Sequence, residues 1–394
     1  MGTLSVSPAR GKESFSFQYA DEWLKSGFSQ LIDPDLQFYS GTFYPRNEKP
    51  NFGIFLDSCP DRWGRVLMQR REALIAKQEA RSVKKLHESD FLLGVFDGHR
   101  MGALRFKTDP DGPFLNDNTS MATPPWTSLA ALEQASLKFE EDNTDDPDYL
   151  KWIGMLVAPG SSLGGARPKA SVLDTKKQLW IAKFPSQQDE KDTGAWEMIA
   201  RELGLRAGIN MAEGKLLRFN NKYHTFLTRR FDRTADGGRI HFASAMTLLD
   251  HQDGEAGTAS YLELMEFISR HAVHVERDLE ELWRRIVFSI AIKNTDDHLR
   301  NHGFLLEPNG WTLSPAYDIN PNEYGKELSL NISETDNSLD LGLALSVAPY
   351  FRLKETRAGE IIQQVTTAIS RWRTIATNLK ISKGEIERMA IAFE

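Results

Sequence analysis

The alternation of apolar and polar positions along the chain predicts both helices and strands. Apolar residues recur at helical spacing in several long segments, and shorter apolar runs or alternations indicate strands between them. The predicted helices are Ala20–Ser26, Trp63–Ala80, Leu129–Phe139, Ala195–Leu205 and Leu282–Ile292. The predicted strands are Phe15–Tyr19, Gln178–Phe184 and Gly303–Leu306. This mixture predicts an α+β fold.

The first 106 residues are expected to form one mixed α/β domain. Asp97-Gly98 lies inside the stretch 94–106, and this dipeptide favours the tight turn of a hairpin. Asp57 and Asp61 precede the helix that begins near Arg62, where a carboxylate can cap free backbone N–H groups. Helix capping is therefore the favoured interpretation of both acids, and catalysis is the alternative.

A linker separates this domain from the rest of the chain. Residues 107–125 hold four prolines together with glycine and asparagine, a composition that disfavours regular structure. With the helix that follows, the connecting region is expected to span 107–148. Residues 149–394 are expected to form a second domain with two parts, 149–233 and the mostly helical 234–394.

Composition narrows the class of protein only slightly. A chain of 394 residues that is 40% hydrophobic and 26% charged can bury a large core. Cys59 is the only cysteine, which excludes an internal disulfide and fits a reducing compartment. We expect a cytoplasmic protein, because the sequence shows neither signal architecture nor an apolar run that could span a bilayer. The formal net charge of −7 argues against a surface that coats nucleic acid.

Candidate chemistry is concentrated in the polar segment 293–303, between the apolar helix and the strand. Asp296 is followed five positions later by Asn301, the spacing of a protein-kinase catalytic loop. In such a loop the aspartate accepts the acceptor's proton and the asparagine holds magnesium. A second acid, Asp318 in Tyr317-Asp318-Ile319, follows at the separation expected for a metal-binding aspartate. Taken alone, Asp296 and its neighbour Asp297 could instead serve at a helix end or a turn.

Three further groups precede the loop in the order that phosphoryl transfer requires. The glycine-rich turn 160–166 could bring backbone N–H groups to phosphate oxygens. Lys183, near the end of its strand, could pair with nucleotide phosphates, and Glu197 on the next helix could hold it there as an ion-pair partner. A loop between strands, a solvated strand edge and a helix-dipole acid are the structural alternatives.

The motifs in this order resemble the HipA family of bacterial serine/threonine kinases, the toxins of type II toxin–antitoxin modules. The resemblance covers nearly the whole chain. It rests on the segments 162–169, 230–233, 295–301 and 315–318 in the second domain, and on 57–65 and 101–106 in the first. It implies a two-lobed, protein-kinase-like fold that uses ATP and Mg²⁺.

The resemblance also implies a role for individual residues. Asp296 would be the catalytic base, Asn301 and Asp318 the magnesium ligands, and Lys183 the phosphate-pairing lysine. His298 would lie near the phosphates, and Tyr317 belongs to the same nucleotide site. The phosphate loop would comprise Gly164, Gly165, Ala166, Arg167, Pro168 and Lys169. Arg229, Arg230 and Phe231 would form the hinge against adenine, and Asp232 would meet the ribose.

Regulation is implied as well. Ser162 matches a loop serine that family members phosphorylate on themselves to switch off, although Ser161 beside it is an alternative.

Asp297 stands where the best-known pattern has glycine, so that two acids are adjacent, and the spacing to Asn301 favours Asp296 as the base. Family members usually have one further strand before the segment that matches Gly2-Thr3-Leu4, so the N-terminal sheet is expected to have an open edge.

The sequence therefore predicts a HipA-type serine/threonine protein kinase that silences itself by autophosphorylation. Its substrate would be a protein such as an aminoacyl-tRNA synthetase or a translation factor. A HipB-like helix-turn-helix antitoxin would be its partner, and DNA would be contacted only through that partner. The alternatives are a small-molecule phosphotransferase, which shares the loop spacing, and a non-catalytic adaptor that regulates transcription with a DNA-binding protein.

Overall fold

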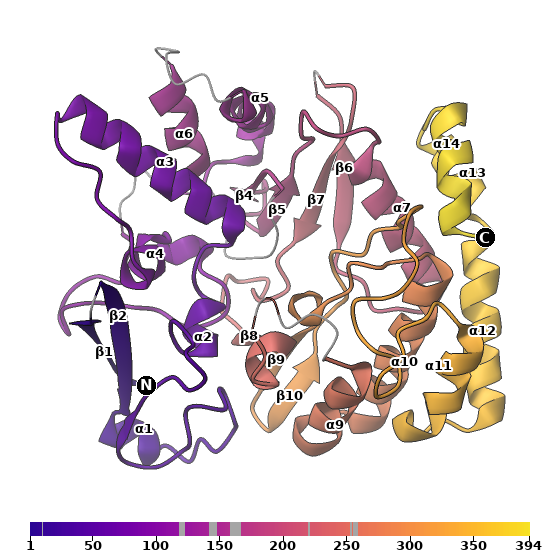
Figure 1. Ribbon diagram of the computed structural model, residues 1–394, viewed down its shortest axis with the longest axis horizontal. Helices are drawn as coiled ribbons and strands as arrows, with labels where there is room; N and C mark the ends of the chain where they lie inside the picture. The colour runs from indigo at the N-terminus through magenta and orange to yellow at the C-terminus, as the bar shows by residue number, and fades with distance from the viewer. Residues whose placement is uncertain are drawn as a thin grey trace. The chain divides into compact units, whose positions relative to one another are not determined.

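A computed structural model describes residues 1–9, 11–117, 123–141, 148–157, 167–219, 221–252, 254 and 259–394. The chain divides into two compact units (Figure 1). Unit 1 comprises Met1–Gln187 and Asp232–Gln252, and unit 2 comprises Gln188–Phe231 and Asp253–Glu394. These limits do not coincide with the predicted domain boundaries at 106, 148 and 233, which stay a prediction.

Unit 1 contains the sheet β1-β2-β3, the antiparallel pair β4–β5 and helices of different lengths. Its strands are β1 (Gly2–Ala9), β2 (Lys12–Tyr19), β3 (Thr42–Phe43), β4 (Lys169–Leu173), β5 (Leu179–Lys183) and β8 (Phe242–Ser244). Its helices are α1 (Asp21–Leu24), α2 (Gly53–Leu56), α3 (Arg62–Gln78), α4 (Glu88–Gly94), η1 (Asp97–His99), η3 (Trp126–Ser128), α5 (Leu129–Glu140), α6 (Tyr149–Val157) and α8 (Ala245–Leu248). β1 pairs along its length with β2 and is the first strand in the sheet order β1-β2-β3. The open edge expected for this sheet stays a prediction.

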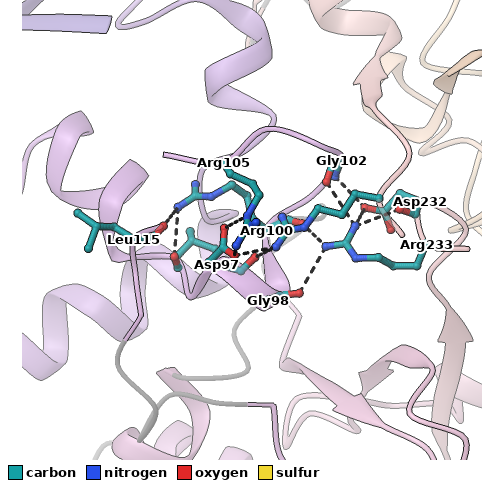
Figure 2. A network of polar contacts seen from close by, with 10 residues as sticks. Asp97, Gly98, Arg100, Gly102, Arg105, Leu115, Asp232 and Arg233 are labelled. Atoms are coloured by element: carbon teal, nitrogen blue, oxygen red, sulfur yellow. Dashed lines mark hydrogen bonds and ion pairs between the residues drawn. The ribbon is translucent and has the colours of Figure 1, made fainter. Parts of the chain in front are cut away.

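The turn predicted at Asp97-Gly98 is wrong. Asp97 begins the short helix η1, and its carboxylate accepts hydrogen bonds from Arg105 instead of closing a hairpin (Figure 2). The tight hairpin turn also requires positive φ, which Gly102 adopts at +71° and Gly98 does not. The long-range ion pairs of Asp97 therefore decide the local structure.

The two acids near α3 have different structural roles. Asp61 is the N-cap of α3 and accepts a hydrogen bond from the Gly64 backbone N–H at 2.8 Å, as predicted. Asp57, in contrast, does not cap that helix. Its carboxylate accepts hydrogen bonds from the backbone N–H and the hydroxyl of Ser244, each at 2.8 Å, and so fixes the residue that caps α8. The described part of the linker 107–125 contains isolated bridges but no helix or strand.

Unit 2 is mostly helical and is organised around α10. Its helices are α7 (Thr193–Arg206), α9 (Tyr261–His271), α10 (Val275–Ala291), η4 (Leu299–Asn301), α11 (Leu341–Val347), η5 (Ala348–Phe351), α12 (Glu355–Ile369), α13 (Trp372–Asn378), α14 (Lys383–Met389) and η6 (Ala390–Ala392). Its strands are β6 (Gly214–Leu217), β7 (Thr225–Arg229), β9 (Gly303–Glu307) and β10 (Gly310–Leu313). The antiparallel hairpins β6–β7 and β9–β10 are the only strand pairs among its described residues.

Helix α10 forms the centre of the apolar core of unit 2. Its Leu282, Trp283 and Phe288 are fully buried, and it packs against α9, α11 and α12 (Figure 1). Burial of each such side chain contributes roughly 1.5–3 kcal/mol. This packing fixes the C-terminal end of α10, from which the predicted catalytic loop begins. None of the described helices is long and apolar enough to cross a membrane.

Candidate active site

The loop predicted to carry the chemistry is held between two regular elements, as expected. Helix α10 ends at Ala291, and β9 begins at Gly303. Lys293 takes a positive φ of 50°, which turns the chain away from the helix axis, and the Asn294 backbone N–H then donates to the Ser289 carbonyl at 2.8 Å. The polar segment is therefore placed by its backbone as well as by its side chains.

The two adjacent acids of the loop have opposite environments. Asp296 is exposed, whereas Asp297 is 4% exposed. Asp297 accepts a hydrogen bond from the Tyr261 hydroxyl at 2.5 Å and lies 3.0 Å from Nε2 of His302. Burial alone would raise the pKa of the Asp297 carboxyl, but His302 and Tyr261 outweigh it and hold that pKa below its usual range. Asp297 is thus a buried carboxylate whose two oxygens are engaged.

Asp296 keeps a carboxyl group that solvent can reach. Desolvation by the surrounding loop raises its pKa above the ordinary value, His298 opposes that rise, and the negative charges of Asp318 and Asp297 add to it. Asp318 comes from a different segment of the chain, and its charge is one of those that act on the Asp296 carboxyl. Such an acid can accept a proton from a nearby hydroxyl.

Asn301 and Asp318 offer oxygen atoms beside this acid. The Asn301 side-chain nitrogen donates to the Asp296 backbone carbonyl at 3.0 Å, which uses the amide N–H and leaves its oxygen as the atom for a cation. Asp318 adopts a left-handed backbone with φ of 57°, a conformation that is uncommon for a residue with a side chain. Tyr317 anchors this turn, since its hydroxyl donates to the Arg300 carbonyl at 2.6 Å.

The oxygen donors fit a magnesium ion. Mg²⁺ prefers oxygen ligands and usually keeps several waters and phosphate oxygens, so one or two protein ligands suffice. Among the described residues, there is no group of three or more His, Cys, Asp or Glu that could hold a metal ion. Asn301 and Asp318 would be the ligands shared with a nucleotide.

A small pocket in unit 2 brings Asp318 and Glu197 together. It is a shallow, open pocket with a cavity volume of only about 10 Å³, and it is also lined by Arg201, Phe226 and Tyr317. Glu197 lies on α7, as predicted, and is 6% exposed. Lys183 is the last residue of β5 in unit 1, so the predicted ion pair between Lys183 and Glu197 connects the two units and stays a prediction.

The residues assigned to the nucleotide divide between described and undescribed segments. Gly164, Gly165, Ala166 and both candidate serines lie outside the described residues. Arg167 is partly exposed and Pro168 is buried. Lys169 is the first residue of β4, and its ammonium lies 2.7 Å from the Asp61 carboxylate in an ion pair whose side chains are 3% and 4% exposed. In this structure Lys169 therefore serves the packing of β4 on α3.

The predicted hinge follows β7 directly. Arg229 ends that strand and pairs with Glu213, Arg230 is buried, and the Phe231 ring lies 5.4 Å from that of Tyr317.

Asp232 is fully buried in unit 1. Its carboxylate accepts hydrogen bonds from the Gly102 backbone N–H and from Arg233, each at 2.7 Å (Figure 2). The ribose contact of Asp232 stays a prediction.

Sequence reasoning missed two residues that hold the loop, Tyr261 and His302. Tyr261 is 36 positions from Asp297, and the pattern around it indicates only the capping box of α9, formed by Ser260 and Glu263. A histidine directly before an apolar strand was the one available signal for His302, because a buried imidazole needs a polar partner.

Comparisons with known proteins relate this chain to HipA-like proteins. A family model described as the HipA-like C-terminal domain matches residues 161–372. The chain is 28% identical over 181 residues to a putative kinase of Haemophilus influenzae, covering 41% of this chain and 52% of that protein. It is 23% identical over 237 residues to Toxin YjjJ of Escherichia coli K12, covering 57% and 50%. The chain thus spans about half the length of these curated relatives.

Among solved structures, the chain resembles one from the Shewanella oneidensis MR-1 toxin–antitoxin complex of HipA, HipB and operator DNA. The TM-score is 0.64 at 18% identity, over 99% of this chain and 92% of that chain. This likeness confirms the predicted fold class, a mixed α and β fold of the HipA type.

Proposed function

The chain belongs to the family of HipA-like C-terminal domains, and from this premise we propose that it is an ATP- and magnesium-dependent serine/threonine protein kinase. The observation that carries the proposal is the grouping of Asp296, Asn301 and Asp318. Asn301 hydrogen-bonds the backbone of Asp296, and the charge of Asp318 acts on the Asp296 carboxyl. An exposed acid beside two oxygen donors suits transfer of a phosphoryl group to a hydroxyl.

Asp296 would accept the proton of the acceptor hydroxyl as that oxygen attacks the terminal phosphorus of ATP, and ADP would leave with the electron pair of the P–O bond that breaks. Asn301 and Asp318 would hold the magnesium ion, which when bound with ATP neutralises charge on the phosphates. Asp297 is buried and engaged with Tyr261 and His302, so it is unsuited to meet a substrate. Positioning and charge neutralisation would then supply most of the rate, and the base would contribute roughly 10²–10⁴-fold.

Self-inhibition would act through the glycine-rich loop. A phosphate on Ser162 adds about −1.5 to −2 charges, which would occupy or repel the site of the ATP phosphates. The family resemblance supports Ser162 as the modified residue, and Ser161 is its neighbour.

Partners follow from the same resemblance. HipB accompanies HipA and operator DNA in the Shewanella complex. We propose that a HipB-like helix-turn-helix antitoxin binds this chain, that DNA is contacted through it, and that the substrate is a translation factor or an aminoacyl-tRNA synthetase.

Intact-mass spectrometry after incubation with ATP tests the proposal. The wild type, first freed of phosphate, should gain one phosphate with Mg²⁺ and none with EDTA. Asp296→Asn should gain it at least about 100-fold more slowly, whereas Asp111→Asn, at an exposed acid outside the site, should match the wild type. Mapping the phosphate to Ser162 rather than Ser161 would identify the regulatory serine.

Two outcomes would contradict the proposal. Near wild-type transfer by Asp296→Asn would exclude Asp296 as the base. A wild type that modifies neither itself nor any protein, but does phosphorylate a sugar or an aminoglycoside, would be a small-molecule phosphotransferase.

A further inference from the structure

The five-residue interval from Asp296 to Asn301 is closed by two contacts at its ends. The first is the hydrogen bond from the Asn301 side chain to the Asp296 carbonyl, at 3.0 Å. The second contact joins Asp297 and His302, the residues that directly follow Asp296 and Asn301 in the sequence. Asp297 Oδ1 lies 3.0 Å from His302 Nε2. The imidazole N–H is not aimed along that line, so the contact is electrostatic more than a straight hydrogen bond. Two contacts therefore connect the start of the loop to its end, one at Asp296 and Asn301 and one at the residues that follow them.

Solvent hardly reaches the second contact. The side chains of Asp297 and His302 are 5% and 3% exposed, and Tyr261, whose hydroxyl donates to Asp297 Oδ2 at 2.5 Å, is fully buried. Electrostatic attraction is stronger in such surroundings than in water, and an unpaired buried carboxylate would be costly. The contact thus has the strength to hold a backbone in place.

The same carboxylate connects to the segment that carries Asp318. The Ser289 hydroxyl on α10 lies 3.5 Å from Asp297 Oδ2 and accepts from the Asn294 side chain at 3.3 Å. The Asn294 oxygen in turn accepts the Asn320 backbone N–H at 3.0 Å, two residues after Asp318. One polar network therefore reaches the backbone beside all three groups assigned to the reaction.

We propose that Asp297 and His302 form a clasp that sets the separation of Asp296 and Asn301. This inference rests on the proposed kinase function. Asp297 and His302 act as positioning residues, because each holds the backbone of the functional residue directly before it. Tyr261 orients the carboxylate within the clasp. The presence of two adjacent acids then has a simple reason, since one faces the substrate and the other faces the core.

Kinetics of matched variants test the clasp. Asp297→Asn removes the carboxylate and His302→Gln removes the imidazole ring, and each should lower kcat and the apparent Mg²⁺ affinity by about 10–100-fold, as loss of a residue that orients a metal ligand does. The double variant should be no less active than the less active of the two single variants, because both substitutions break the same contact. The KM for ATP should change less than the Mg²⁺ affinity.

A matched hydroxyl pair separates positioning from stability. Tyr261→Phe removes the hydrogen bond to Asp297, and Tyr19→Phe removes a buried one to the Leu36 carbonyl in unit 1. The first should lower the Mg²⁺ affinity and the second should not, at comparable losses in thermal midpoint. Equal effects of the two variants, or additive effects of Asp297→Asn and His302→Gln, would overturn the clasp.

Hydrogen exchange over residues 293–303 gives a readout that needs no activity. Tyr261→Phe and Asp297→Asn should exchange faster there than the wild type, while α12 stays protected. Unchanged exchange in the loop refutes the clasp whether or not the wild type transfers phosphate. An inactive wild type with faster loop exchange in the variants would refute the kinase and retain the clasp.

Discussion

Replacement of Lys169 by methionine is expected to destabilise the chain by about 3–5 kcal/mol, the usual result of removing one partner of a buried ion pair. The Lys169 ammonium and the Asp61 carboxylate are 2.7 Å apart, and both side chains are at most 4% exposed. Burial already raises the pKa of the Asp61 carboxyl, and Lys169 is the main group that opposes the rise. Without the lysine, the buried Asp61 carboxylate would lose the positive charge that lies 2.7 Å away, or would take up a proton.

The double variant refines the magnitude. Asn is as good an N-cap as Asp, so Asp61→Asn should keep the bond that Asp61 accepts from the Gly64 N–H at the start of α3. Asp61→Asn combined with Lys169→Met leaves no buried charge and should recover most of the lost stability. Asp61→Asn alone should also be destabilising, because it removes the buried carboxylate that the Lys169 ammonium contacts at 2.7 Å.

Urea unfolding followed by tryptophan fluorescence measures these free energies, and binding of a fluorescent ATP analogue is measured beside it. Lys176→Met, at an exposed lysine of the same hairpin, is the control and should change stability by less than about 0.5 kcal/mol. A Lys169→Met variant with wild-type stability but much weaker ATP binding would refute the reasoning. Such a result would instead support the role in the phosphate loop that the sequence resemblance implies for Lys169.

Two further predictions concern stability. A Cβ at Gly194 in α7 would lie 2.4 Å from the His224 carbonyl oxygen, so Gly194→Ala should lower the free energy of unfolding in urea by roughly 1–3 kcal/mol. Gly359 on α12 has open space around it, so Gly359→Ala should raise that free energy by about 0.5–1 kcal/mol. Burial lowers the pKa of His241 from its ordinary 6.5 to about 4. Between those pH values the unfolded chain binds a proton at this residue and the folded chain does not. The free energy of unfolding should therefore fall by up to about 3 kcal/mol as the pH is lowered from 6.5 to 4. His241→Asn should flatten this dependence, and an unchanged slope would show that another group causes it.

The sequence predicted those elements whose signal is long and local. Helix α10 has a continuous buried face, and its end, the polar loop and the start of β9 were all expected at their observed positions. Helix α5 was predicted to within one residue at each end for the same reason. Periodicity over three turns reports burial directly, because only one face of the helix meets the core.

Signals that depend on distant partners could not be read in advance. Asp97 forms ion pairs with Arg105 and with Arg239, 142 positions away, and these override the turn preference of Asp-Gly. Lys169 meets Asp61 at a separation of 108 residues, so a lysine that follows a glycine-rich turn gave no sign of being buried. In both cases a tertiary charge pair determines what a local motif does.

The adjacent acids of the loop combine both kinds of information. Spacing to Asn301 favours Asp296 over Asp297, and burial separates them independently, because only Asp297 has its carboxylate enclosed by Tyr261 and His302. The Asp297 carboxylate is met inside the protein by the Tyr261 hydroxyl and the His302 ring. The negative charge of Asp318 instead raises the pKa of Asp296. Two such carboxylates with an amide oxygen favour a bound cation, because a cation turns their mutual repulsion into a shared attraction. The charges of the two acids, and not the motif alone, therefore support the metal site that we propose.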